Sequence, residues 1–405
     1  MARSKRDLNI SQQLAYGPID VPFFMLTMLL LGIGLVMMFS ASYATAYYDS
    51  SADGATFYIE KQLRFAFVGL VVMFFISKFN YQHYRQLAFP AVVFSIILLI
   101  LVVGPFGLGF GEAEVGSQRW LKIGSFNFQP SEIAKVTVIV YFAARLSTRG
   151  TEKGKLYSKR TFMGSFLNKL QKAGYLELGP YVLVLGIIVF LMLKQPHMSG
   201  TILILVGAAS VMFAAGIQMK FFLLACAAAA GGLGFFVMYK ADYMRSRVQL
   251  WLDPWSDPQD KGFQIIQSLY AIGSGGLTGL GLGQSRQKYL YIPEPENDFV
   301  FPIVVEELGF IGALVIIILY MLLILRGYWL ALHSRDRFGA LLIVGNITLL
   351  AVQVFLNIGV VTNFIPTTGI SLPFFSYGGT ALMIQLAQMG MILAVSRQIS
   401  PVRQD

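Results

Sequence analysis

The chain has 405 residues, of which 56% are hydrophobic and 13% are charged. Soluble proteins carry about 25% charged residues, so this composition excludes an ordinary soluble enzyme and a disordered protein. It predicts a helical protein that crosses a membrane several times. The formal net charge of +10 then indicates an excess of lysine and arginine on the cytoplasmic side, rather than binding to nucleic acid.

Ten apolar segments each approach the roughly 20 mostly apolar residues that a helix needs to cross a bilayer. They are residues 21–48, 63–77, 87–103, 130–146, 180–193, 201–217, 221–239, 301–325, 338–361 and 381–395. The first is far longer than the apolar core of a signal peptide, so we interpret it as a retained anchor. The predicted fold is an all-α, polytopic integral membrane protein with ten transmembrane helices in a single domain.

The distribution of basic residues predicts the orientation of these spans. When residues 1–20 are placed in the cytoplasm, most of the 31 lysines and arginines fall in inner segments, as the positive-inside rule requires. Both termini are then cytoplasmic, residues 147–178 form a basic cytoplasmic loop, and residues 240–300 form one large extracytoplasmic loop. The basic loop has two open interpretations: a solvated segment that touches anionic lipid, or a docking site for a partner.

The predicted outer loop is too long to be a plain connector. Its residues Phe263, Ile266, Leu269 and Tyr270 have helical spacing, which predicts a short helix on the bilayer surface. The glycine-rich run at 273–283 resembles a phosphate-binding loop only superficially, since no Gly-Lys-Ser/Thr ending follows it. We expect a flexible or tightly packed turn there.

Three charged residues at the end of this loop are candidates for chemistry. Arg286 and Lys288 follow the glycine run and could hold a phosphate. Asp298 is the last charge before an apolar span, and a partly desolvated carboxylate is a better base. A helix N-cap, for which Asn297 or Asp298 would serve, is an equal alternative.

Four ionisable residues fall inside predicted spans, where they are costly and often functional. Glu132 and Lys135 are three residues apart, so they share a helix face and can neutralise each other. Glu306 and Glu307 need a cationic partner, for which we expect Lys135. A structural ion pair and a substrate contact are both open.

The histidines do not have the spacing of a metal site. They are His83, His197 and His333. A cation site made of two acidic residues on the outer face stays open, so the metal is unknown.

Four motifs resemble the SEDS family (shape, elongation, division, sporulation), which includes FtsW, RodA and SpoVE. The longest is residues 366–380, PTTGISLPFFSYGGT, which contains Ser376, Tyr377, Gly378 and Gly379. The others are Arg119-Trp120-Leu121 with QPSEIAK at 129–135, Gln195-Pro196 with Ser199-Gly200-Thr201, and NDFVF at 297–301 with EELG at 306–309. Together these matches run along nearly the whole chain.

The resemblance implies a peptidoglycan glycosyltransferase that polymerises lipid II, a disaccharide-pentapeptide on undecaprenyl pyrophosphate, at the outer face of the cytoplasmic membrane. It also implies a class B penicillin-binding protein as transpeptidase partner, alongside other division or elongation machinery. The essential aspartate of the family falls on Asp298, and its Glu/Lys pair falls on Glu132 and Lys135. The sequence departs from the family at His197, where many members are acidic, and at residues 115–118.

An inverting reaction needs one base and a cationic group for the departing pyrophosphate. On the resemblance, Asp298 is the base, and Arg119, Lys135, Arg286 and Lys288 are candidates for the phosphates, with Mg²⁺ or Mn²⁺ as an optional aid. Glu132, Glu306, Glu307 and the signature residues 376–379 then support the site. Two other functions compete with this one: a lipid II flippase, and a non-catalytic scaffold for a transpeptidase.

Overall fold

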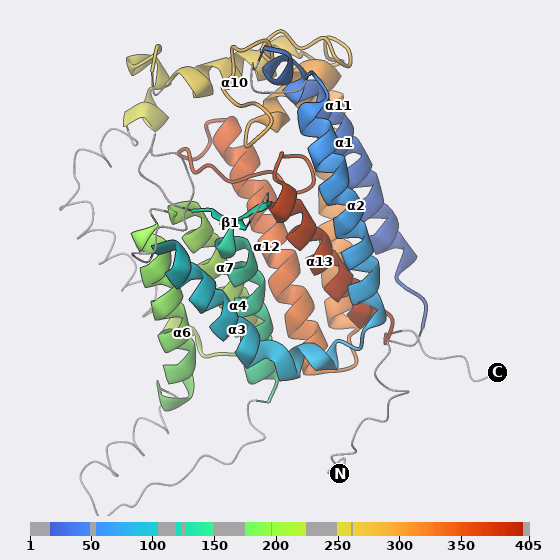
Figure 1. Cartoon of the computed structure of the whole chain (residues 1–405), viewed down its shortest axis with the longest axis vertical. Helices are drawn as coiled ribbons and strands as arrows, with labels where there is room; N and C mark the ends of the chain where they lie inside the picture. Colours follow the sequence, from blue (N-terminus) through green and yellow to red (C-terminus); the bar gives the residue numbers. More distant parts are fainter. Residues whose placement is uncertain are drawn as a thin grey trace, which may run out of the picture.

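The computed structural model describes residues 17–48, 54–103, 119–123, 126–148, 175–195, 197–223, 249–260 and 262–399. Within them the chain forms a bundle of long helices capped at one end by a loop segment (Figure 1). Most of the predicted cytoplasmic segments 1–20 and 147–178 lies outside the described residues.

The helices of the bundle are α1 (Val21–Tyr48), α2 (Phe57–Lys78), α3 (Gln82–Val103), α4 (Pro130–Ser147), α6 (Tyr175–Lys194), α7 (Met198–Ala214), α11 (Val300–Leu332), α12 (Arg337–Val361) and α13 (Gly379–Ser396). Five of these, α1, α3, α11, α12 and α13, are long and apolar enough to cross a membrane, and α6 and α7 provide shorter apolar segments. Large apolar side chains such as Phe67 and Phe89 are exposed on the outside of the bundle, as expected for a surface that faces lipid.

The polytopic all-α prediction is therefore confirmed. Nine of the ten predicted segments coincide with these helices, whereas most of residues 221–239 lies outside the described chain. The count of ten spans and the orientation of the termini remain predictions.

Small residues allow close packing between helices of the bundle. Gly69 of α2 faces Leu386 of α13, where an added Cβ would lie 2.6 Å from the leucine side chain. Gly390 of α13 faces the backbone of Met73 in the same way, at 2.7 Å. Such contacts are typical of helices that associate inside a membrane. They bring α13, and with it the signature segment, against α2.

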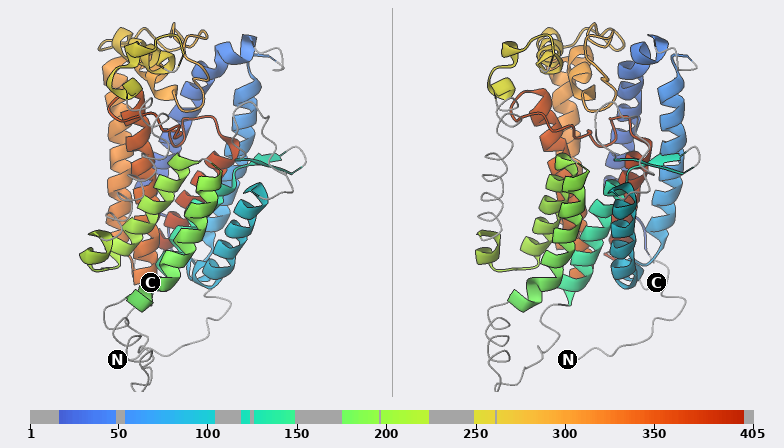
Figure 2. Two further views of the ribbon diagram at one scale, coloured as in Figure 1. Left: turned by 90° about the vertical axis from the view of Figure 1, so that its left-hand side faces the viewer. Right: turned by 60° about the vertical axis from the view of Figure 1, so that its left-hand side comes forward.

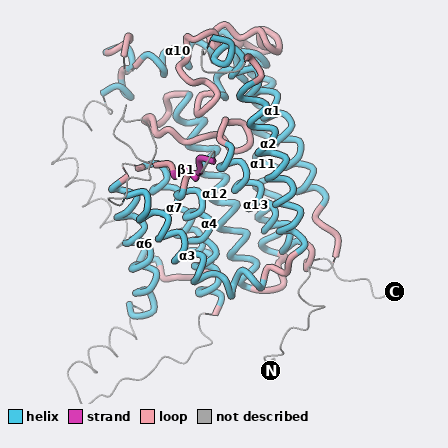
Figure 3. The backbone as a smooth tube through the Cα atoms, in the orientation of Figure 1, coloured by secondary structure: helices cyan, strands magenta, loops and turns pink. Residues whose placement is uncertain are grey.

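The two ends of the bundle differ. The start of α1 and the end of α13 lie together, because the backbone N–H of Asp20 donates to Ser396 and the Asp20 carboxylate binds Arg326. Residues 254–299 cover the opposite end (Figure 2). Between α12 and α13 the chain runs as a loop inside the bundle beneath this cap (Figure 3), with Leu372 and Phe375 buried.

The cap contains α10 (Phe263–Ser274) and the 3₁₀ turn η3 (Pro254–Ser256). The helix predicted after Gly262 is confirmed. The glycine run that follows is a tightly packed turn, because it inserts into a break in α11 at Gly309, whose φ is 69°. The N–H groups of Leu280 and Gly281 donate to the carbonyl oxygens of Glu306 and Glu307, at 2.9 and 3.0 Å.

The backbone N–H groups that follow the break at Gly309 are hydrogen-bonded as well. The N–H groups of Phe310 and Ile311 donate to the carbonyl oxygens of Gly276 and Leu277, at 2.9 and 3.1 Å. The loop thus replaces the helical hydrogen bonds that α11 loses at Gly309, which a buried backbone requires.

A two-stranded antiparallel sheet precedes α4. It consists of β1 (Leu121–Ile123) and β2 (Phe126–Phe128), with Leu121 opposite Phe128. No helical or apolar pattern predicts this sheet, although a Gly-Ser pair between two three-residue runs is a hairpin signal. The hairpin ends at Phe128, two residues before Pro130 begins α4, and so connects Arg119 to the start of that helix.

Candidate active site

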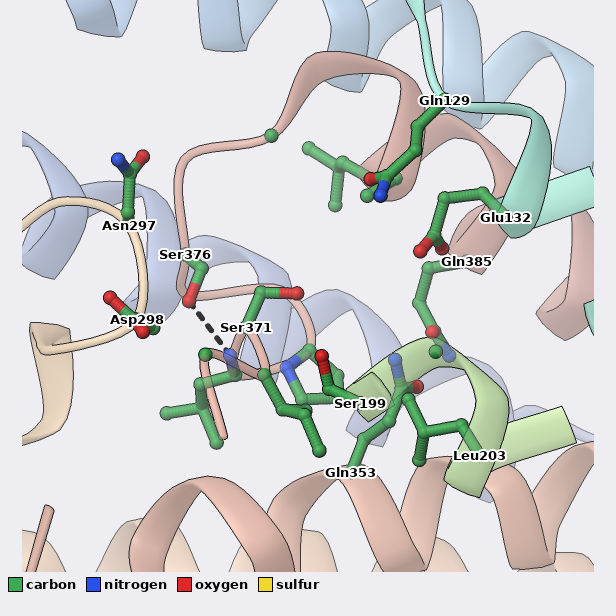
Figure 4. Close-up of a pocket in the computed structure, with 18 of the residues that line it drawn as sticks. Gln129, Glu132, Ser199, Leu203, Asn297, Asp298, Gln353, Ser371, Ser376 and Gln385 are labelled. Atoms are coloured by element: carbon green, nitrogen blue, oxygen red, sulfur yellow. Dashed lines mark hydrogen bonds between the residues drawn. The ribbon is translucent and has the colours of Figure 1, made fainter. Parts of the chain in front are cut away.

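A cavity of about 440 Å³ lies beneath the cap, where the signature loop meets the starts of α4, α7 and α13. Its volume is within the range of small-molecule sites, about 300–1,000 Å³. Figure 4 shows Asp298 and Asn297 on one side, and Gln129, Glu132 and Gln385 on the other. Several of the residues that the sequence predicted as functional line it: Arg119, Glu132, Lys135, Asp298, Ser376, Tyr377 and Gly378.

Asp298 comes one residue before Phe299, the N-cap residue of α11, and no side chain makes a cap hydrogen bond there. The alternative in which Asp298 or Asn297 caps this helix is therefore wrong. Burial raises the pKa of the Asp298 carboxyl group to about 6, opposed by a backbone hydrogen bond and assisted by the negative charge of Glu294. A carboxylate with that pKa is ionised at neutral pH and basic enough to accept a proton.

The backbone around Asp298 is fixed by two contacts with the signature region. The side-chain nitrogen of Asn357 donates to the carbonyl oxygens of Asp298 and Ile370, at 2.8 and 2.7 Å. The N–H of Tyr377 donates to the carbonyl oxygen of Glu296 at 2.6 Å. Sequence reasoning missed Asn357, although an asparagine within an apolar span is itself a signal of function.

The opposite side of the cavity carries the charged residues of α4. Lys135 and Glu132 form an ion pair of 2.8 Å, and their side chains are 4% and 14% exposed. The prediction that they neutralise each other is confirmed. Arg119 also lines the cavity, so positive groups and the Asp298 carboxylate share one space.

His197, the departure from the family pattern, lies at the start of α7 and lines the same side. Its Nε2 is 3.3 Å from the side-chain nitrogen of Gln129. Burial, together with the positive charges of Arg119 and Lys135, lowers the pKa of His197 to about 3. The imidazole is therefore neutral at physiological pH.

Lys288 does not line the cavity, contrary to its predicted phosphate-binding role. Its ammonium group is buried, 3.0 Å from Glu307, 3.1 Å from the Ser40 hydroxyl and 2.7 Å from the carbonyl oxygen of Gly283. The physical reason is the glycine turn, which folds the loop back across α11. Lys288 is thus buried outside the cavity, where it does not reach a pyrophosphate bound within the cavity.

The predicted pairing of Lys135 with Glu306 and Glu307 is wrong for the same reason. Glu307 pairs with Lys288, and Glu306 accepts hydrogen bonds from the backbone N–H groups of Arg286 and Gln287, at 3.1 and 3.3 Å, and from the Ser285 hydroxyl. These carboxylates fasten the cap to α11. Arg286 takes part in this attachment through its backbone N–H and is not among the residues that line the cavity.

The signature loop forms the wall between the two sides. The Ser376 hydroxyl accepts a hydrogen bond of 2.7 Å from the N–H of Leu372, and Gln62 of α2 donates to the Ser376 carbonyl oxygen at 3.2 Å. At Gly379, where α13 begins, an added Cβ would lie 2.2 Å from the ring of Phe65. These contacts explain why the segment needs a serine and a glycine at these positions.

A metal site is not evident among the side chains that the structure describes, since nowhere do three or more His, Cys, Asp or Glu residues come together. Two carboxylates, Glu294 and Asp298, line the cavity on one side. That number suits Mg²⁺ held jointly with substrate phosphates rather than by the protein alone.

Comparison with known proteins identifies the family. Residues 21–400 match the FtsW/RodA/SpoVE family of cell cycle proteins. Stage V sporulation protein E of Bacillus subtilis is 41% identical over 383 residues, covering 93% of this chain and 97% of that protein. A Geobacter metallireducens protein named probable peptidoglycan glycosyltransferase FtsW is 38% identical, covering 94% and 95%.

Solved structures agree. A chain from a structure described as "Structural coordination of polymerization and crosslinking by a peptidoglycan synthase complex" is 29% identical, with a TM-score of 0.72 over 96% of this chain and 99% of that one. The rod shape determining protein RodA of Thermus thermophilus is 26% identical, with a TM-score of 0.63 over 96% and 98%. The protein is a multi-pass protein of the cytoplasmic membrane, and it belongs to the FtsW/RodA/SpoVE family.

Proposed function

We propose that this protein is a peptidoglycan glycosyltransferase that polymerises lipid II into β-1,4-linked glycan strands at the outer face of the cytoplasmic membrane. The strands would serve cell division, elongation or sporulation. One observation carries the proposal: the Asp298 carboxylate and the cationic side chains of Arg119 and Lys135 line the same cavity. The relatives named as glycosyltransferases support it.

The reaction that suits this cavity is a single displacement with inversion. The 4-hydroxyl oxygen of the acceptor sugar forms a bond to the anomeric carbon of the donor, and the bond from that carbon to the pyrophosphate breaks. Asp298 accepts the hydroxyl proton. Its pKa of about 6 keeps it ionised at neutral pH, which a general base requires.

Arg119 and Lys135 are the residues we assign to the departing pyrophosphate. A positive group placed where negative charge develops lowers the barrier most when it is already in position. Glu132 holds the Lys135 ammonium at 2.8 Å, so we assign it a positioning role. Mg²⁺ or Mn²⁺ would neutralise further charge on the pyrophosphate, with Glu294 and Asp298 as carboxylates of the cavity that would share in holding the ion.

We also propose a class B penicillin-binding protein as the partner that cross-links the product, within the division or elongation machinery. The similar chain from a peptidoglycan synthase complex that coordinates polymerisation and crosslinking supports this. Placement of residues 240–300 outside and 147–178 inside the cell belongs to the same proposal.

The test uses purified full-length protein in liposomes that contain fluorescent lipid II, with and without the cognate transpeptidase. We expect glycan strands that lysozyme digests, and loss of strands in the Asp298→Asn variant. Translocation of lipid II without polymer would instead identify a flippase. If Asp298→Asn supports growth whenever the complex assembles, the protein is a scaffold and the proposal is wrong.

A further inference from the structure

Three polar side chains of the cavity have an atom without a hydrogen-bond partner among the residues that the structure describes. The atoms are Oε1 of Gln353, Nε2 of Gln385 and Nδ1 of His197. The three side chains are 5%, 7% and 8% exposed, and all three line the cavity. They come from α12, α13 and the start of α7, so three separate helices place them around one space.

Unpaired polar atoms at these positions are costly. Leaving a buried donor or acceptor without a partner costs about 1–3 kcal/mol. A leucine or methionine at position 353 or 385 would avoid it. Figure 4 shows both glutamine side chains reaching into the cavity beside Glu132 and Leu203, where a bound molecule could complete their hydrogen bonds.

The chemistry of these groups restricts what that molecule is. A glutamine amide offers a donor and an acceptor whichever way its end is oriented. The imidazole of His197 is neutral, because burial and the nearby positive charges lower its pKa to about 3. Its Nε2 accepts from the side-chain nitrogen of Gln129, so its Nδ1–H is the donor left for a ligand. A phosphate can only accept hydrogen bonds, whereas hydroxyl and acetamido groups both donate and accept.

The charges around these groups agree with an uncharged ligand. The three groups carry no charge themselves, since two are amides and the imidazole of His197 is neutral. The apolar side chains of Leu203 and Leu382 line the same cavity and suit the carbon–hydrogen face of a sugar ring. Mixed donors and acceptors beside an apolar surface are the usual composition of sites that orient an uncharged small molecule.

We propose that Gln353, Gln385 and His197 form an uncharged subsite that binds the hydroxyl and acetamido groups of one amino sugar of the substrate. This inference rests on the proposed function and deepens it. The subsite separates recognition of the sugar from recognition of the pyrophosphate, which is left to Arg119 and Lys135. It also gives a role in binding the sugar to His197, which stands where many members of the family have an acidic residue.

The experiment compares two ligands that share the lipid and the pyrophosphate: lipid II, which carries the disaccharide-pentapeptide, and undecaprenyl pyrophosphate, which does not. Their affinities for purified full-length protein in nanodiscs are measured for the wild type, Gln353→Met and Gln385→Met. We expect each substitution to weaken lipid II binding roughly three- to tenfold, the worth of one neutral hydrogen bond, and to leave undecaprenyl pyrophosphate binding unchanged. The melting temperature should stay the same or rise.

Gln388→Met is the matched control. Gln388 lies one turn further along α13, is 3% exposed and also has an unpartnered side-chain nitrogen within the described chain, but it does not line the cavity. Its replacement should leave both affinities unchanged.

Equal losses for the two ligands, or none, would overturn the subsite, and so would a drop in melting temperature for Gln353→Met and Gln385→Met alone. These outcomes differ from failure of the proposed function, in which the wild type itself neither binds nor polymerises lipid II.

Discussion

The side-chain nitrogen of Asn357 lies 2.8 Å from the carbonyl oxygen of Asp298. The same nitrogen donates to the carbonyl oxygen of Ile370 at 2.7 Å, so one amide joins the backbone of Asp298 to the signature loop. Both acceptors are carbonyl oxygens, which means that only the nitrogen end of the amide can face them. Asn357 is 1% exposed, so its side chain is held in place by packing. Its two hydrogen bonds therefore position the backbone of Asp298 beside the cavity.

Asn357→Asp should impair catalysis more than binding. The substitution keeps the shape but turns a carboxylate oxygen toward two carbonyl oxygens, which displaces the Asp298 backbone. Misplacement of a reacting group by about 1 Å can cost about 100-fold in rate, so we expect a fall in kcat of roughly 10- to 100-fold with a smaller change in KM. Steady-state polymerisation kinetics check this.

Asn346→Leu serves as the control for that variant. Asn346 lies on the same helix and donates to Leu342 within its own helix, so its loss should leave the polymerisation rate near that of the wild type. If both variants lose activity in parallel with thermal stability, Asn357 is a structural residue only.

The pH dependence of polymerisation should reflect Asp298. A base acts in its ionised form, so the rate should fall as pH drops through about 6, the pKa to which burial raises this carboxyl group. Glu294 adds negative charge that raises the pKa further. Glu294→Gln should therefore shift the acidic limb to lower pH, measured as initial rates between pH 4.5 and 8; a limb that does not move would contradict the coupling.

Lys288→Met should destabilise the protein strongly. The substitution leaves Glu307 buried without its cation, and breaking one side of a buried pair costs roughly 3–5 kcal/mol. Thermal unfolding in detergent measures the loss, and Lys288→Met combined with Glu307→Gln should recover part of it. The exposed pair of Arg64 and Glu60, separated by 3.7 Å, provides the comparison, because Arg64→Met should change stability by no more than about 1 kcal/mol.

Gly309→Ala should separate the cap from α11. Its φ of 69° strains any residue with a side chain, and an added Cβ would lie 2.3 Å from the backbone nitrogen of Gly279. We expect a lower melting temperature and faster proteolysis within residues 275–290. At Gly273, in α10, an added Cβ meets nothing within 4 Å, and Gly273→Ala should be neutral or stabilising because alanine favours a helix.

The apolar pattern predicted the helices well and the loop contacts poorly. The first predicted span and α1 have the same bounds, residues 21–48. By contrast α2 begins at Phe57, ahead of the predicted residue 63, because Glu60 and Lys61 lie exposed near its start and end the apolar run on which the prediction depends. The pairing of Lys288 with Glu307 was not predictable, since it depends on a glycine turn that folds into a broken helix.

In the candidate site, too, contacts within one helix were predictable and contacts between distant segments were not. Helical spacing alone paired Glu132 with Lys135 correctly. That Asp298 lines the same cavity as that pair was implied by the family resemblance and by no pattern in the sequence, because the residues lie more than 160 positions apart. Polar residues inside apolar spans, such as Asn357, Gln353 and Gln385, were visible in the sequence, and their cost in a membrane is the signal that marks them.

The central claim is that Asp298 is the base of a lipid II polymerase. The most direct test is the amount of glycan strand that purified wild type and Asp298→Asn make from lipid II at pH 7.5, with both melting temperatures measured. Loss of a general base typically costs about 10²–10⁴-fold in rate, so we predict that Asp298→Asn makes almost no strands. It should melt no lower than the wild type, because a carboxyl group whose pKa is raised on folding destabilises the folded state at pH above that value. Strand synthesis by a stably folded Asp298→Asn protein at the wild-type rate would contradict the account.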